Sequence, residues 1–173
     1  MQRFYEYFNE IFFCGSLEGL CAINFTDQLF QEDAQNAEDY SLALAYTPST
    51  GPKHRVQIPD GYAALIKIGD RSCDSPLLDE EKRLKGYLEA LVHEMLHVFF
   101  GVYECLCSHA CRCRHMKNLG SGGHGESWQL AALAVEQATL PLLGERLDLS
   151  RKISFEHDPS YVVDANTYAR FKF

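Results

Sequence analysis

The stretch that decides the fold is LKGYLEALVHEMLHV, residues 84–98. Apolar side chains recur in it at alternating spacings of four and three residues: Leu84, Leu88, Leu91, Met95 and Val98. At about 100° per residue they fall within an arc of about 80°, which predicts a helix with one buried face. We expect this helix to begin near Ser75 and Pro76, because serine is a common N-cap and proline suits the first helical position.

A second face of the same helix combines two histidines with very small residues. The same angular arithmetic places five residues on an arc of similar width: Gly86, Ala90, His93, His97 and Gly101. Apart from the histidines, this face has almost no side chains. It therefore leaves room for another element of the fold to approach the helix closely.

The two histidines belong to an H-E-x-x-H motif that runs from His93 to His97. Residues four apart lie one turn apart on one face, so both imidazoles can reach a single zinc ion. Glu94 lies about 60° around the axis from His97, beside the metal and not bound to it. From there it can take a proton from zinc-bound water, whose pKa falls to about 7. The competing interpretation is a chance match, or a histidine pair hydrogen-bonded within the core.

A catalytic zinc keeps three protein ligands and an open fourth position, so the motif needs a third ligand. The metzincin spacing is excluded, because Phe100 and Tyr103 stand where that pattern requires glycine and histidine. His124 is the preferred ligand, since it lies between two glycines at the start of the next predicted helix; the competing interpretation is a solvated loop histidine. The weaker alternatives are Glu126, His109 and His115.

These residues together resemble the SprT-like family, whose best-known members are the Spartan proteases. The resemblance rests on the motif His93–His97, on Gly123-His124-Gly125, and on Trp128. Residues 8–17 are also similar to the family's opening pattern, F-N-x-x-F-F-x-G-x-L. The matching part of the chain runs from about residue 4 to about residue 140.

The resemblance implies a zincin-like single domain of the α+β class over residues 1–146, followed by a tail of unclear structure over 147–173. It implies a small antiparallel or mixed sheet packed against the long helix. The zinc ligands would be His93, His97 and His124, with Glu94 as the general base. The expected function is a zinc-dependent metalloendopeptidase acting on proteins, and the alternative is a non-catalytic zinc-binding module that acts through partner binding.

Spartan-type members degrade proteins crosslinked to DNA, so the resemblance also implies DNA-bound or DNA-crosslinked substrates. The 173 residues carry 24 acidic and 16 basic side chains, a net charge of −8, and neither a zinc ribbon nor a long basic segment. Bulk attraction to phosphate is therefore not expected, and DNA contact would need a local basic patch. The densest candidate consists of Arg112, Arg114 and Lys117.

The stretch between His97 and His124 is longer than the family's usual spacing and holds a cysteine-rich insertion, residues 104–118. Its thiols follow the pattern C-x-C-x3-C-x-C: Cys105, Cys107, Cys111 and Cys113. We expect a loop that can bind a second, structural zinc. Free thiols and disulfides are the alternatives.

The remaining elements follow from shorter patterns. A helix is expected over 2–13, closed by Gly15, strands over 20–25, 41–46 and 63–68, a turn over 47–53, and a helix over 126–139 ended by Pro141. The sequence has no apolar run long enough to span a membrane and no signal peptide, which predicts an intracellular location, nucleus or cytoplasm. In such a reducing compartment the seven cysteines are expected to be thiols or metal ligands.

Overall fold

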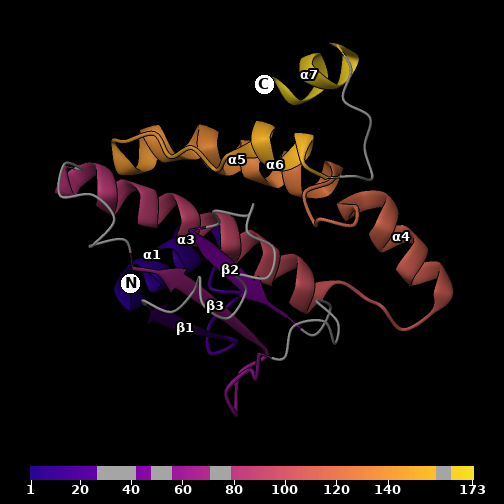
Figure 1. The fold of residues 1–173 in the computed structure, drawn as a ribbon, viewed down its shortest axis with the longest axis horizontal. Coiled ribbons are helices and arrows are strands. Elements are labelled where there is room, and N and C mark those ends of the chain that lie inside the picture. Colours follow the sequence, from indigo (N-terminus) through magenta and orange to yellow (C-terminus); the bar gives the residue numbers. More distant parts are fainter. Residues whose placement is uncertain (27–41, 48–55, 71–78, 159–164) are drawn as a thin grey trace. The chain divides into compact units, whose positions relative to one another are not determined.

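The computed structural model describes residues 1–26, 42–47, 56–70, 79–158 and 165–173 (Figure 1). They form two compact units, Met1–Val102 and Tyr103–Phe173. The described residues contain six helices and one mixed sheet of three strands, which confirms the predicted α+β class. None of the helices among them is both long and apolar enough to cross a bilayer.

The sheet belongs to the first unit and is built around one fully covered strand. Its strands are β1 (Cys21–Thr26), β2 (Ala43–Tyr46) and β3 (Ala64–Gly69), arranged in the order β1-β3-β2. β3 pairs in parallel with β1 and antiparallel with β2. Consecutive residues Ala64, Leu65 and Ile66 of β3 are all buried, so both faces of the central strand are covered. The three predicted strands are confirmed, while residues 48–53 of the predicted turn lie outside the described residues.

The first helix, α1 (Gln2–Phe13), ends as the sequence predicts. Cys14 and Gly15 both have positive φ, and the Gly15 N–H donates to the carbonyl of Asn9 at 3.0 Å. The buried Asn9 side chain accepts a second hydrogen bond, from the Leu17 N–H at 2.9 Å. Tyr5 in turn donates its hydroxyl proton to the Leu17 carbonyl at 2.7 Å. The polar residue of the opening pattern thus holds the chain reversal that follows the helix.

The long helix α3 (Glu80–Tyr103) begins later than predicted. Asp79 is its cap, because its carboxylate accepts the Glu81 N–H at 3.2 Å; Ser75 and Pro76 lie outside the described residues. The predicted buried face holds for Leu91, Met95 and Val98, which are fully buried, but it is wrong for Leu84, which is 42% exposed. The helix is about 36 Å long, whereas a six-residue strand spans about 20 Å, so the sheet does not cover the whole helix.

The small-residue face of α3 is expected from the sequence to leave room for another element, and two of its glycines lie near the residues that flank β2. A Cβ atom on Gly86 would lie 3.9 Å from the side chain of Leu42, and one on Gly101 would lie 2.5–2.6 Å from Thr47. Leu42 and Thr47 flank β2 on either side. Gly101 therefore marks a close approach of the helix to Thr47, whereas the distance at Gly86 is that of an ordinary van der Waals contact. His93 and His97 lie between the two glycines on the helix.

The second unit is helical: α4 (His109–Leu119), α5 (Glu126–Leu143), α6 (Arg151–Glu156) and α7 (Ala165–Phe171). In α5, Trp128, Ala132 and Val135 are buried on one side of the helix. The expectation that Pro141 ends this helix is wrong, because α5 continues to Leu143 and Gly144 is its left-handed cap. A proline so close to the C-terminal end removes a single helical hydrogen bond, which the last turn tolerates.

The segment 147–173, whose structure the sequence leaves unclear, contains α6 and α7 (Figure 1). Arg151 attaches this segment to α5: the residue is 5% exposed, and its guanidinium donates to Glu136 Oε2 at 3.1 Å and also donates to the Phe171 carbonyl. Gln129, fully buried on α5, donates to the Arg151 carbonyl at 3.0 Å. One buried cation thereby joins α5, α6 and α7.

The contact at Gly101 makes a prediction about stability. Replacing Gly101 by alanine is expected to destabilise the first unit by about 1–3 kcal/mol, because the new methyl group overlaps Thr47. The matched Gly86→Ala replacement has room and should stabilise the helix by about 0.5–1 kcal/mol. Denaturant unfolding followed by circular dichroism measures both, and equal stability of the two variants would contradict the packing described.

Candidate metal centre

His93 and His97 are brought together by one turn of α3. Their Nε2 atoms lie 3.2 Å apart, and the ring centroids are 5.0 Å apart at 53°. Two nitrogens bound at 2.0–2.1 Å to one tetrahedral zinc would be separated by about 3.3–3.4 Å. The separation therefore fits a shared metal ion, and it also fits a hydrogen bond between one protonated and one unprotonated nitrogen. Both rings are half-buried, so the pair is a group that can hold a metal.

Glu94, the predicted general base, is 7% exposed. It directly follows His93 on α3, about 100° farther around the axis. Glutamate is seldom so buried unless it has a partner or a role for its charge. The structure thus places a buried carboxylate next to the imidazole pair, which is the arrangement that the motif predicts.

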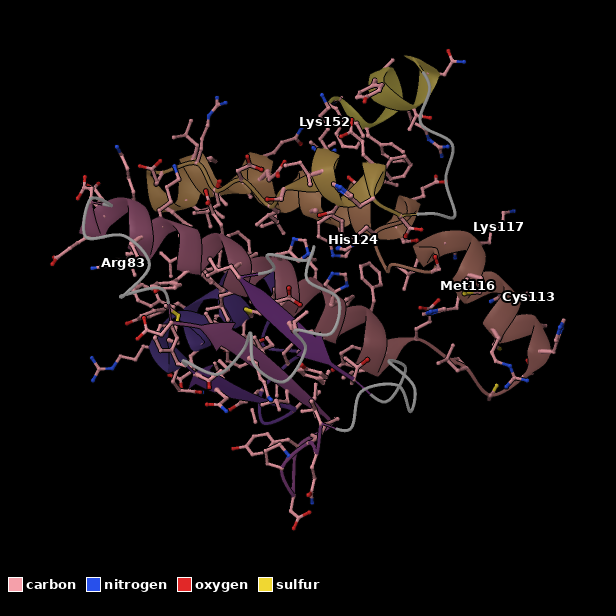
Figure 2. The ribbon with its side chains drawn as sticks, viewed as in Figure 1. Arg83, Cys113, Met116, Lys117, His124 and Lys152 are labelled. Atoms are coloured by element: carbon pink, nitrogen blue, oxygen red, sulfur yellow. The ribbon has the colours of Figure 1, made fainter. Side chains whose placement is uncertain are left out.

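His124 lies in the second unit, in the glycine-rich segment that leads into α5 (labelled in Figure 2). Its ring meets the Trp128 ring edge-on, with centroids 4.9 Å apart at 86°. Its carbonyl accepts a hydrogen bond from the buried Gln129 side chain at 3.2 Å, and Gly125 is the N-cap of α5. The predicted position at the start of a helix is confirmed, and the role of His124 as a zinc ligand stays a prediction.

A buried carboxylate far along the chain holds the same glycine-rich segment. Asp158 is 2% exposed; it accepts the Gly122 N–H at 3.0 Å and the Ser121 hydroxyl proton at 3.4 Å. A Cβ atom on Gly122 would approach this carboxylate to 3.0 Å. Sequence reasoning missed Asp158, because 36 residues separate it from Gly122 and no local pattern connects them.

The alternative third ligands each have another partner within the second unit. Glu126 pairs with Arg170. His115 Nδ1 lies 2.6 Å from a carboxylate oxygen of Glu104, and His109 lies 3.6 Å from the Cys113 thiol.

Three of the four clustered cysteines lie together. The Sγ atoms of Cys105 and Cys107 are 2.9 Å apart, those of Cys107 and Cys111 are 3.7 Å apart, and all three lie within 4.8 Å of one another. Cys113 lies with His109 instead. The sequence predicts a loop here, but residues 109–119 are helical, and positions two apart on a helix differ by about 200°. Figure 2 shows Cys113 on α4 with Met116 and Lys117.

The clustered thiols differ in acidity. A hydrogen bond from the Ser108 side chain, followed by those from Cys107 and Cys105, lowers the pKa of Cys111 to about 7. Hydrogen bonds with Cys105 and Cys111 raise the pKa of Cys107 to about 11. The buried Cys21 is a contrasting case, because desolvation raises its pKa to about 12. All six cysteines in the described part of the chain are free of disulfides.

These differences predict selective alkylation in the reduced, metal-free protein. Cys111 should react with iodoacetamide with a midpoint near pH 7, because the thiolate is the nucleophile, whereas Cys107 should react only at much higher pH. Ser108→Ala should move the Cys111 midpoint upward. Peptide mass spectrometry over a pH series resolves each site, and Cys21 is the control that reacts only after unfolding. Identical titration of Cys107 and Cys111 would contradict this picture.

Comparisons of the chain with protein-family models, with curated proteins and with solved structures find no match. The resemblance to the SprT-like family therefore rests on the residues quoted from the sequence. The functional argument depends on the chemistry of the side chains that each unit holds in place.

Proposed function

We propose that this chain is a zinc-dependent metallopeptidase of the SprT-like type with a zincin-like fold. The observation that carries the proposal is the 3.2 Å separation of the His93 and His97 Nε2 atoms on α3, with buried Glu94 beside them. A separation close to that of two ligands on one tetrahedral zinc favours metal binding, and a base next to the ligands favours hydrolysis over a purely structural site.

His124 is proposed as the third ligand. Metal ligands need fixed orientations, and neighbouring hydrogen bonds commonly supply them. The segment around His124 has such support: Gln129 holds the His124 carbonyl, and Asp158 holds the backbone two residues earlier.

The chemistry proposed for the protein side chains follows from their positions. A zinc ion, when bound, would lower the pKa of a water ligand to about 7 and polarise the scissile carbonyl. Glu94 accepts the proton of the attacking water and then delivers it to the departing amine. The helix fixes the Glu94 carboxylate relative to the two imidazoles, because Glu94 directly follows His93 and His97 lies one turn after His93.

A peptide substrate is proposed from the H-E-x-x-H motif and from the family resemblance, as the peptidase activity itself is. That proteins bound or crosslinked to DNA are the substrates is proposed from the family resemblance alone.

The proposal predicts separate effects for the ligand and the base. His97→Ala should lose one zinc per chain relative to wild type and all peptidase activity. Glu94→Gln should keep that zinc but lower casein hydrolysis by about 10²–10⁴-fold, because only the proton transfer is removed. Elemental mass spectrometry and a fluorescent casein assay, with and without single-stranded DNA, measure both. If the wild type retains zinc but hydrolyses no casein, either with or without single-stranded DNA, the non-catalytic binding module is favoured instead.

The anchoring of the His124 segment gives a second test. Asp158→Ala should weaken zinc retention by about 10–100-fold, because the glycine-rich segment loses two hydrogen bonds. Asp148→Ala is the control, since Asp148 lies in the same unit but its carboxylate accepts from the exposed Ser150 N–H. Competition with a chelating indicator gives the affinities. Equal zinc affinity in the Asp158→Ala and Asp148→Ala variants would show that Asp158 does not support the zinc site.

A further inference from the structure

The cysteines outside the histidine motif form a site of their own within the second unit. Cys105 and Cys107 lie in the segment before α4, and Cys111 lies in its first turn. The three sulfurs lie within 4.8 Å of one another, although Cys105 and Cys107 come from a non-helical segment and Cys111 from a helix. Three exposed or half-exposed thiols that meet in this way gain little from packing, since they bury little apolar surface.

The sulfur geometry is close to that of a metal site and unlike that of a disulfide. Two thiolates bound at about 2.3 Å to a tetrahedral zinc lie about 3.8 Å apart, and the Cys107 and Cys111 sulfurs are 3.7 Å apart. The Cys105 and Cys107 sulfurs, at 2.9 Å, are closer than that but well beyond the bond length of about 2.05 Å in a disulfide. A small outward rotation of Cys105 would bring all three into coordination.

The surroundings of the three sulfurs favour negative charge. Cys111 is the third residue of α4, where the unpaired N–H groups and the helix dipole stabilise anions. The Ser108 side chain accepts the Cys111 N–H at 3.2 Å and so fixes this first turn. Arg112 donates to the Leu106 carbonyl at 3.3 Å, between the first two cysteines, and brings a permanent positive charge to the cluster.

We propose that Cys105, Cys107 and Cys111 bind one thiophilic divalent metal ion of the zinc type, independently of the histidine motif. Sulfur donors select soft or borderline ions such as Zn²⁺ and Cd²⁺ over Mg²⁺ or Ca²⁺. Three thiolates and a divalent ion have a net charge of −1, which the Arg112 guanidinium offsets. Cys113 is not a ligand, because it faces His109 on the other side of α4.

The bound ion has a structural role in this proposal. It joins the segment 105–107 to the first turn of α4, a region whose side chains are otherwise largely exposed. Metal binding of this kind contributes directly to the stability of the folded segment. The chain is therefore expected to resist proteolysis after Arg112 and Arg114 when the ion is present.

The experiment is a Cd²⁺ titration of the full chain after reduction and chelation, followed by thiolate-to-metal charge-transfer absorption. Imidazoles give no such band, so the signal is independent of the proposed peptidase zinc. Wild type should show a saturable band with one equivalent that Zn²⁺ displaces. Cys111→Ser should lower its intensity by about one third or more and weaken binding, because one of three thiolates is lost. The matched control Cys113→Ser, two residues along the same helix, should leave band and affinity unchanged.

Three results would overturn the proposal: no band in wild type, an unchanged band in Cys111→Ser, or an equal loss in Cys113→Ser. A Cys105–Cys107 disulfide in the purified protein before reduction, found by peptide mass spectrometry, would overturn it as well. Tryptic cleavage after Arg112 provides a second readout that does not depend on absorption. Zn²⁺ should slow it at least tenfold in wild type and not in Cys111→Ser, whose far-ultraviolet circular dichroism should match that of wild type. Cleavage that is indifferent to Zn²⁺ in wild type would refute the structural role.

Discussion

The close approach of α3 to Thr47, the residue that follows β2, is the tightest packing constraint described in the first unit. The helix can come this near only where it lacks a side chain, and Gly101 supplies that point. One turn before Gly101 on the same face of the helix lies His97, and His93 lies one turn before that. The packing at Gly101 therefore constrains the part of the helix that carries the candidate metal ligands.

The polar contacts of the second unit complement this apolar packing. Gln129 makes two hydrogen bonds from one amide, to the His124 carbonyl and to the Arg151 carbonyl, and so links the glycine-rich segment to α6. Glu136 receives Arg151 and also accepts the Leu149 N–H at 2.9 Å. Buried polar groups of this kind are stable only when nearly all their partners are present, which makes them specific as well as stabilising. The position of His124 is thus a property of the whole second unit.

The sequence predicts those features of the fold that produce a regular spacing of apolar residues. Apolar spacing identified α1, α3, α5 and the three strands, because each buries one face or both faces. It could not identify α4, because this helix is rich in cysteine, histidine and arginine, and Leu119 is the one side chain of the helix that is buried. Leu84 fits the apolar spacing of α3 yet is exposed. The spacing shows on which face of a helix a residue lies, but not how much of that face other elements cover. The candidate ligands of the motif follow from their spacing, whereas Asp158 and Arg151 make contacts that are distant in sequence and that no local pattern records.

The carboxylate of Asp158 has a consequence for how this protein can be divided. Motif boundaries suggest cutting the chain after residue 146, which would retain the histidines and both long helices. Such a fragment would lose Asp158 and the Arg151 anchor and would expose the apolar side of α5 that α6 covers. The shortest autonomous piece that keeps the glycine-rich segment in its present form must therefore extend past α6, and the Phe171 carbonyl that receives Arg151 extends the requirement to α7. Hydrogen bonds of Asp158 and Arg151 therefore set where a fragment of this protein can be cut, and an expression fragment or fusion junction should be placed beyond them.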